Sequence, residues 1–232
     1  MAKRTFDDFD EFASNYRSIH SGNIKISGAD SFYFAEMKVQ LLAAFEGAEK
    51  QEVLDVGCGD GATEIFIQQH FPAWQVTAID VSAKSIAEAS SKKISNSVFE
   101  VYNGSAIPLA NSSVDIIFIA GVLHHVEYAL HKTLINELVR VLKKGGRLYL
   151  FEHNPLNPLT RYLVNTCVFD KNARLLKSSY TLKLLTQVKL IVTHKKFIIF
   201  FPRKGLFSKL IFLEKYLQWL PAGGQYFIRA MK

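Results

Sequence analysis

The sequence predicts a doubly wound α/β fold, in which a mostly parallel sheet carries helices on both faces. Between residues 52 and 152, short apolar runs with strand character alternate with segments whose apolar residues have helical spacing. The first apolar run breaks into three glycines at alternate positions, Gly57, Gly59 and Gly61, before helical spacing resumes. Such alternation is typical of parallel sheets, because parallel strands need long crossover connections that are usually helices.

Two helices are expected before the sheet. In residues 5–20, Phe6, Phe9 and Phe12 recur at helical spacing, and Tyr16 continues the same stripe. A second helix is expected over Asp30–Phe45.

The alternating region supplies five strands and three helices. The last of these helices ends at Lys143-Lys144-Gly145-Gly146, where basic residues and glycines suit a helix C-terminus. The strands are expected at Glu52–Val56, Gln75–Asp80, Val98–Tyr102, Val114–Ile119 and Arg147–Glu152, and the helices at Ala62–His70, Ala83–Ser91 and Leu130–Leu142.

The pattern is less regular beyond Pro158. We expect one or two helices there, then a strand near Ile191–Phe201, a basic amphipathic helix near Leu206–Leu220, and a last strand at Gln225–Met231.

Length and composition bound the class of protein. The chain has 232 residues and is 49% apolar, which is enough for one domain with a substantial core. Its apolar stretches are too short to span a bilayer, and the start, MAKRTFDDFDEF, lacks the apolar block of a secretory signal. Cys58 and Cys167 form no disulfide framework or metal site pattern. We therefore expect a cytoplasmic protein.

The net charge of +7 conceals two unlike parts. Residues 141–232 hold 17 Lys and Arg against three acids, a net charge of +14, whereas residues 1–140 have a net charge of −7. Such a basic segment indicates an anionic partner, which could be an acidic substrate, a phosphate, a nucleic acid or an anionic membrane. A solvated lysine-rich surface accounts for the same charge.

The residues around the glycine turn select among its possible ligands. A phosphate-binding P-loop needs a lysine after its glycines, and Gly61-Ala62-Thr63 has none. A dinucleotide site needs G-x-G-x-x-G, whereas this spacing differs and Asp55 and Asp60 would crowd a pyrophosphate. These acids suit an ammonium group, and Asp80, at the end of the next strand, can bind both hydroxyls of a ribose. The residues therefore favour a nucleoside with an amino-acid tail, S-adenosylmethionine.

The motifs VLDVGCGDG, TAIDVS, FIAGVLHHV and LVRVLKKGGRLYLFE resemble those of the class I S-adenosylmethionine-dependent methyltransferases. The resemblance covers about Glu52 to Glu152 and is to the type 11-like, small-molecule branch, which includes quinone-biosynthesis enzymes. It implies a Rossmann-like sheet of seven strands with the last strand antiparallel. The flanks, DDFDEFASNYRSIHSGNIKISGADSFYFAEMK and EHNPLNPLTRYLVNTCVFDKNARLL, resemble a subgroup associated with surface-polysaccharide or lipid-linked sugar biosynthesis.

The resemblance implies roles in cofactor binding. The turn would surround the methionine moiety, Asp80 would bind the ribose and Val81 would lie against the adenine. The turn residues concerned are Asp55, Gly57, Cys58, Gly59 and Gly61.

Three further positions carry expectations from the resemblance. Ser105 and Ala106 occupy the place where the family often has an acid beside the adenine amino group, and Ser105 departs from that acid. Ala120 ends the fourth strand beside the methyl-bearing centre. Tyr16 matches an aromatic residue that often covers the cofactor, although packing in the core would explain its stripe equally well.

These roles divide the chain into three parts. Residues 1–46 would form an N-terminal helical lid and residues 47–153 the S-adenosylmethionine-binding core. Residues 154–232 would complete the sheet and form the acceptor side.

Candidate catalytic residues follow the fourth and fifth strands, at the carboxyl edge of the sheet where open α/β folds bind ligands. Methyl transfer to a hydroxyl needs a base, and a histidine titrates near neutral pH. His125 is favoured over His124 for this role, and both could instead pack against or cap the next helix. Glu152 and His153 are candidates for acceptor contact. No clustered ligand set predicts a metal, although ligands can be far apart in sequence.

The acceptor is less well defined than the cofactor. The sequence after the fourth strand, AGVLHHV, lacks the Asn/Asp-Pro-Pro-aromatic tetrad of base and glutamine methyltransferases, and no nucleic-acid-binding module accompanies it. We expect a small-molecule acceptor, such as a sugar or an anionic, lipid-linked precursor with a hydroxyl or amine. The alternatives are an RNA or protein methyltransferase using the basic segment, and a non-catalytic cofactor-binding subunit.

The basic helix expected at Leu206–Leu220 suits a membrane interface, because lysines and Trp219 accompany its apolar residues. Peripheral membrane contact is therefore a hypothesis. Packing of the helix on the sheet, or in the interface of a homodimer, is the alternative.

Overall fold

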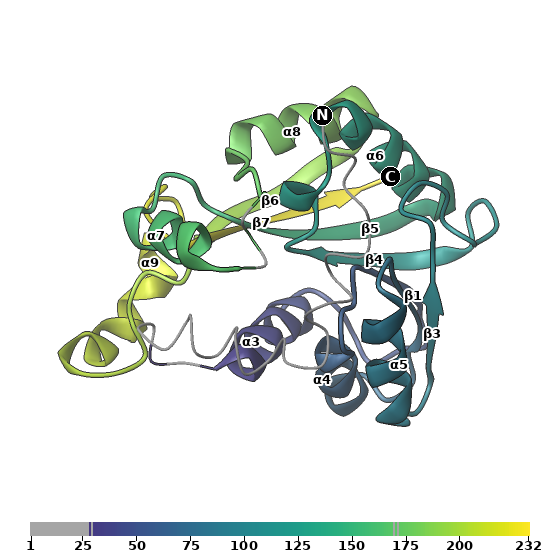
Figure 1. Cartoon of the computed structure of the whole chain (residues 1–232), viewed down its shortest axis with the longest axis horizontal. Coiled ribbons are helices and arrows are strands. Elements are labelled where there is room, and N and C mark those ends of the chain that lie inside the picture. Colours follow the sequence, from purple (N-terminus) through teal and green to yellow (C-terminus); the bar gives the residue numbers. More distant parts are fainter. Residues whose placement is uncertain (1–27, 29, 169, 171) are drawn as a thin grey trace.

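The computed structural model describes residues 28, 30–168, 170 and 172–232 and has a seven-stranded sheet at its centre (Figure 1). The strand order is β3-β2-β1-β4-β5-β7-β6. Six strands run in one direction, and β7 pairs antiparallel with both β5 and β6, so the predicted fold class is confirmed. The strands are β1 Glu52–Val56, β2 Gln75–Asp80, β3 Ser97–Val101, β4 Val114–Ala120, β5 Leu142–His153, β6 Ile191–Ile198 and β7 Gln225–Met231.

Helices cover both faces of this sheet (Figure 1). Alternate residues of each central strand enter separate apolar cores, because successive side chains of a strand point to opposite faces. Ile117 and Leu150 pack with α6 and α8, whereas Phe118 and Phe151 pack with α3 and α4. The helices are α3 Ser31–Ala43, α4 Ala62–His70, α5 Ala83–Ser91, α6 Tyr128–Val141, α7 Pro158–Thr166 and α8 Ser178–Gln187.

The predicted elements between residues 30 and 120 agree with the structure to within two residues. One difference concerns β5, which begins at Leu142 rather than Arg147 and includes the Lys-Lys-Gly-Gly segment expected to end a helix. Gly145 donates its backbone N–H to the carbonyl of Lys232, and Gly146 accepts from the N–H of Lys232. The glycines therefore extend the sheet toward β7. The helix predicted over residues 5–20 lies outside the described residues.

The helix predicted at Leu206–Leu220 is not a continuous α-helix. Residues Leu206–Leu213 form a 3₁₀-helix, η4, and Glu214–Leu217 form a single α-helical turn, α9. No side chain caps either N-terminus. Apolar residues occupy almost every position of η4, so no single face can be buried while a polar face stays in water.

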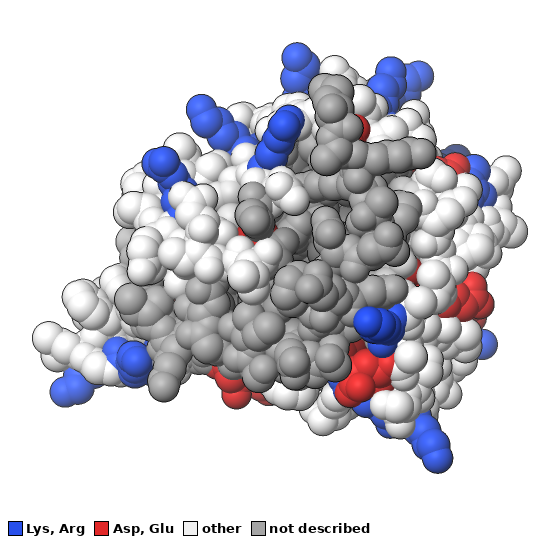
Figure 2. Space-filling model, viewed as in Figure 1, with Lys and Arg blue, Asp and Glu red and all other residues white. Residues whose placement is uncertain are grey.

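Charge is distributed unevenly over the surface. In the view of Figure 2, basic side chains line the upper and left edges, over α8 and near α9, and the largest acidic cluster lies over α4 and α5. No helix among the described residues is long and apolar enough to cross a bilayer.

Candidate active site

The glycine turn joins β1 to α4, and its backbone conformation requires glycine at two places. Gly57 has a φ of +77°, and a Cβ atom there would lie 2.4 Å from Cγ2 of Val122. The backbone N–H of Gly57 donates to the carbonyl of Ile79 (2.7 Å), which ties the turn to β2. Gly61 is the N-cap of α4, with a φ of +78°. The turn therefore places the N-terminus of α4 at the carboxyl edge of the sheet.

Asp80, at the end of β2, connects this turn to the start of α5. Its Oδ2 accepts the backbone N–H of Gly59 (2.9 Å), and its Oδ1 accepts that of Ser82 (2.9 Å). The predicted pair of Asp80 and the glycine turn is thus brought together. Each carboxylate oxygen can accept a further hydrogen bond, so Asp80 can also bind a vicinal diol.

Two buried acids lie below the turn. Asp55 is 2% exposed and Glu64, in the first turn of α4, is fully buried. No hydrogen-bond donor of another residue reaches Oδ2 of Asp55 or the carboxylate oxygens of Glu64, and the two carboxyl groups interact with each other. Burial, reinforced by Glu64, raises the pKa of Asp55, and burial raises the pKa of Glu64 to about 7. An ammonium group would satisfy these oxygens, so the residues present fit the amino-acid end of S-adenosylmethionine.

Lys38, on α3, adds a cation to this region. It lines a small cavity of about 30 Å³ with Glu152, His153 and Gln225, at the ends of β5 and β7. Burial lowers the pKa of Lys38 to about 8, and the carboxylates of Glu152 and Asp55 oppose the shift. Oε1 of Gln225 is buried without a partner. An ammonium and an amide at this place could bind an anionic part of the cofactor or the acceptor.

The remaining predicted cofactor residues lie on neighbouring loops. The side chain of Cys58 is buried in the core, and burial raises its pKa, so only its backbone belongs to the turn. Val81 directly follows β2. Ser105 and Ala106 are exposed after β3, where Oδ1 of Asn103 accepts both of their backbone N–H groups. Ala120 ends β4. Tyr16 lies outside the described residues, so its role as a lid stays a prediction.

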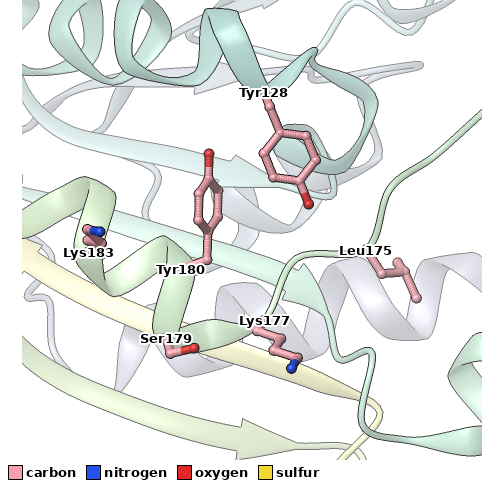
Figure 3. Close-up of a pocket in the computed structure, with 6 residues that line it drawn as sticks. All are labelled: Tyr128, Leu175, Lys177, Ser179, Tyr180 and Lys183. Atoms are coloured by element: carbon pink, nitrogen blue, oxygen red, sulfur yellow. The ribbon is translucent and has the colours of Figure 1, made fainter.

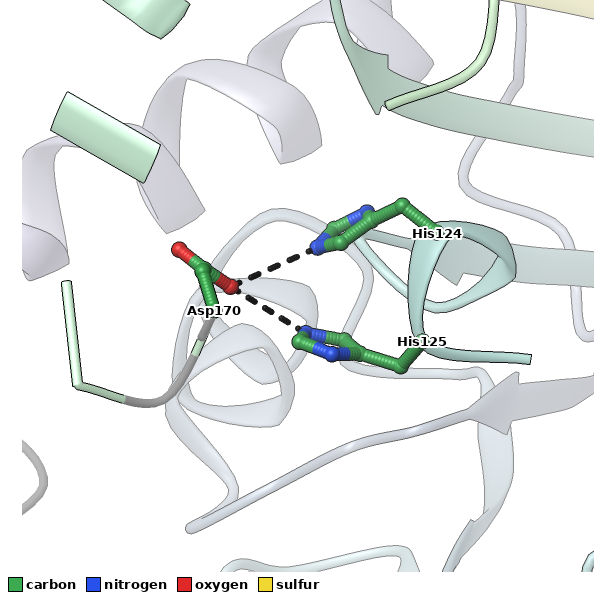
Figure 4. Close-up of side chains that lie close together, drawn as sticks. All are labelled: His124, His125 and Asp170. Carbon is green, nitrogen blue, oxygen red and sulfur yellow. Dashed lines mark ion pairs between the residues drawn. The ribbon is translucent and has the colours of Figure 1, made fainter. Parts of the chain in front are cut away.

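Both predicted histidines lie on η3, a short 3₁₀-helix at Leu123–His125 that follows β4, and they converge on Asp170 (Figure 4). Oδ1 of Asp170 is 3.3 Å from Nε2 of His125 and 3.7 Å from Nε2 of His124. On its other side, His124 Nδ1 lies 2.6 Å from Oε2 of Glu152. Glu152 Oε1 also accepts the backbone N–H of Leu123 (2.8 Å). Glu152 therefore positions His124 and the start of η3.

The electrostatics distinguish His124 from His153. Burial would lower the pKa of His124, but Glu152 and Asp170 outweigh it and raise the pKa to about 9. Burial and the charge of His124 lower the pKa of His153 to about 4. Burial opposes ionisation of Asp170, yet His124 and its neighbours lower its pKa to about 2. At neutral pH, His124 is therefore a charged partner of two carboxylates.

Glu152 was predicted to contact the acceptor. It is 2% exposed and both of its oxygens are engaged with η3, so the geometry favours positioning of His124 over direct contact. His153 lines the small cavity beside Lys38 and remains a candidate for acceptor contact.

A larger, open depression of about 480 Å³ lies at the surface between α6 and the segment that leads into α8 (Figure 3). It is formed where α6 begins and along α8. The hydroxyl of Tyr180 is 2.9 Å from Nδ1 of His131, which fixes that ring. Arg174, which directly precedes Leu175, donates its backbone N–H to the carbonyl of His124 (2.8 Å). The lining residues are Tyr128, Leu175, Lys177, Ser179, Tyr180 and Lys183.

Sequence reasoning missed Asp170, Lys38, Glu64 and Gln225. Asp170 lies 45 positions beyond His125 in the chain, and no pattern in the sequence indicates that the two side chains lie close together. Glu64 offered a signal, because an acid on the inward face of the apolar helix Ala62–His70 is unusual.

Comparisons with known proteins indicate a methyltransferase domain in the part of the chain that holds the glycine turn. Residues 53–146 match a family model described as "Methyltransferase domain". A structure of an S-adenosylmethionine-dependent methyltransferase from Aquifex aeolicus aligns with a TM-score of 0.62, covering 99% of each chain at 17% identity. At that identity the likeness shows the fold.

Two curated relatives carry different names. Ribosomal RNA small subunit methyltransferase C from Pseudomonas entomophila is 29% identical over 140 residues, which are 58% of this chain and 42% of that protein. The 27-O-demethylrifamycin SV methyltransferase from Amycolatopsis mediterranei is 31% identical over 103 residues, 42% of this chain and 37% of that protein. The chain thus spans less than half the length of either relative.

Proposed function

We propose that this protein transfers the methyl group of S-adenosylmethionine to a hydroxyl or amine of a small molecule, a sugar or a lipid-linked precursor. The observation that carries the proposal is the meeting of two groups of residues at one edge of the sheet. The buried acids Asp55 and Glu64, together with Asp80, suit an amino-acid nucleoside, and a histidine–carboxylate cluster follows the adjacent strands.

The cofactor supplies a methyl group already activated on a sulfonium. The protein holds the acceptor in line with the methyl group and removes a proton from it. A hydroxyl or ammonium group must lose a proton in order to gain a methyl group. His125 accepts this proton, and Asp170 stabilises the imidazolium that forms. His124 and Glu152 hold η3 in place, and His153 and Lys38 contact the acceptor.

The open depression supports an anionic, hydroxyl-bearing acceptor. Lys177 and Lys183 supply positive charge, and Tyr128, Tyr180 and Ser179 supply hydroxyls. Because the depression borders the loop that carries His125, an acceptor held there by its anionic part can direct another group toward the histidine. One relative is named for a small molecule, which agrees with this acceptor class.

Calorimetric titration with S-adenosylmethionine and S-adenosylhomocysteine tests the cofactor. We expect Asp80→Ala to weaken binding roughly 100-fold, since two hydrogen bonds to a charged group contribute about 1.5 kcal/mol each. Asp80→Asn, which keeps one acceptor, should fall between. The control is Glu88→Ala, an exposed acid on α5. Absence of binding to a wild-type protein with a cooperative unfolding transition would refute the proposal.

Methylation of RNA is the second candidate, favoured by the basic C-terminal third and by the relative named for ribosomal RNA. Charge reversal at Lys195 and Lys196 on β6 would then lower affinity for RNA and flatten its dependence on salt. The small-molecule proposal expects neither effect. A non-catalytic subunit would bind the cofactor without turnover of any acceptor.

A further inference from the structure

The segment between β6 and β7 exposes large apolar side chains. Over residues 206–219, five of them are between 56% and 74% exposed. No side chain of η4 or α9 is buried. This segment projects from the body of the molecule at the end marked by α9 (Figure 1). The exposed residues are Leu206, Phe207, Phe212, Tyr216 and Trp219, and they define the docking surface discussed below.

Polar contacts, not apolar burial, hold this segment in place. Glu214 Oε1 accepts the backbone N–H groups of Phe200 and Phe201, each at 3.0 Å, and its Oε2 pairs with Arg203 (3.1 Å). The guanidinium of Arg203 lies over the ring of Tyr33 on α3 (4.8 Å). The segment is thus anchored on its inner side, while its most apolar side chains take no part in the core.

The exposed residues lie on three consecutive pieces of the segment. Leu206 and Phe212 are six positions apart on η4, two repeats of a 3₁₀-helix, and Lys209 lies between them. Tyr216 is on α9, and Trp219 is in the turn that follows α9. The exposed surface of the segment therefore combines aromatic and aliphatic side chains with a lysine.

The charge of the same segment identifies what it contacts. Lys204, Lys209 and Lys215 are exposed, and the one acid, Glu214, is engaged with Arg203 and the backbone. Lysines beside Trp, Tyr, Phe and Leu are the composition of segments that lie in the interface of an anionic bilayer.

The docking surface is connected to the candidate active site. The side chain of Asn154, the residue after His153, donates to the carbonyls of Pro221 and Gly223. Two residues later β7 begins at Gln225, which lines the small cavity with Lys38, Glu152 and His153. A molecule drawn from the surface that this segment contacts would therefore arrive at the edge of the sheet that carries the site.

We propose that residues 204–219 dock the protein on an anionic lipid bilayer. Docking itself needs no catalysis; only its use, the presentation of a lipid-linked acceptor, rests on the proposed function.

The two tryptophans give a direct test. Trp74 is 1% exposed and stacked on Phe71, whereas Trp219 is 74% exposed on the docking surface. Added vesicles of phosphatidylglycerol and phosphatidylcholine should shift the fluorescence of Trp219 to the blue, and pure phosphatidylcholine should shift it much less. Trp219→Phe should abolish the shift. An unchanged spectrum with anionic vesicles at low salt would overturn the proposal.

Co-sedimentation with the same vesicles separates the contribution of the apolar side chains to binding from that of the lysines. Phe207→Ser with Phe212→Ser, and separately Lys204→Glu with Lys209→Glu and Lys215→Glu, should each weaken binding at least tenfold. The controls are Leu130→Ser with Tyr162→Ser, exposed apolar residues on α6 and α7, and Lys50→Glu with Lys132→Glu and Lys144→Glu. If the controls weaken binding equally, the surface is not the docking site.

Other occupants would be recognised by their own measurements. Self-association in sedimentation velocity that is lost in Phe207→Ser with Phe212→Ser would assign the surface to a second copy and overturn the proposal. RNA binding lost only in the lysine variant would overturn it as well. Titration of each variant with S-adenosylmethionine keeps the outcomes distinct, because docking variants should bind the cofactor normally.

Discussion

The cofactor side and the C-terminal side of this protein depart from ordinary burial in opposite directions. Below the glycine turn, the acids Asp55 and Glu64 are buried inside the protein, where their carboxyl groups interact with each other. In the C-terminal part, Phe212 and Trp219 are large apolar residues placed outside. Each departure is unfavourable for the isolated chain. Both agree with the proposals that another molecule completes the surroundings, a cationic cofactor in one part and a lipid surface in the other.

The largest expected effect concerns the histidine cluster. His125→Gln should lower kcat at least 100-fold, since general base catalysis typically contributes that much, while cofactor affinity stays unchanged. The measurement is release of S-adenosylhomocysteine with an acceptor identified in a screen. His70→Gln, on the far end of α4, is the control. A change below threefold would remove His125 from the chemistry.

The glycine turn allows a comparison of two substitutions in unfolding experiments. Gly57→Ala combines a positive φ with a contact of 2.4 Å to Val122, whereas Gly59→Ala has a φ of +57° but open space around its new methyl group. We expect about 3 kcal/mol of destabilisation for the first and about 1 kcal/mol for the second, measured by urea without cofactor. Equal losses would show that Val122 moves aside and that sterics do not shape the turn.

The buried pair of His124 and Glu152 predicts a dependence of stability on pH. Because the pKa of His124 is raised in the folded state, its stabilising contribution is complete below pH 6.5 and is lost as pH rises through about 9. Wild type should therefore lose more stability than His124→Gln over this range, by an amount on the order of 2 kcal/mol. Parallel curves would mean that His124 is neutral in the folded protein. Comparison of the two proteins cancels other groups that titrate in the same range.

The smallest expected effect is that of chelation. Ligand atoms of His124, His125 and Asp170 lie within 4.8 Å of one another, an arrangement that could also hold a metal ion. If His125 acts as a base, EDTA should change turnover by less than twofold. If chelation abolished turnover and Zn²⁺ restored it, His124, His125 and Asp170 would be assigned to a metal centre and His125 would not be the base.

The predictability of these features depends on how far apart their parts lie in the sequence. The strands β1 and β2 and the helices α4 and α5 were predicted to the residue, because each is a short apolar pattern with a clear start and stop. The positions of Asp55, the three glycines and Asp80 in the site could be predicted from those boundaries, because these residues lie at or near the ends of β1 and β2. Asp170 and Lys38 reach the site only through the packing of distant segments. The amphipathic α-helix predicted at Leu206–Leu220 was wrong, because apolar residues at almost every position of η4 do not distinguish a 3₁₀-helix from an α-helix.

The position of β7 has a consequence for how this protein folds. β6 precedes β7 in the chain, yet β7 lies between β5 and β6 and is the sole described strand that β6 contacts. Until β7 is inserted, Ile191–Ile198 has no neighbour with which to form backbone hydrogen bonds, and Gln225 is absent from the cavity beside Lys38. The backbone pairing of β6 and the full lining of this cavity therefore both depend on β7.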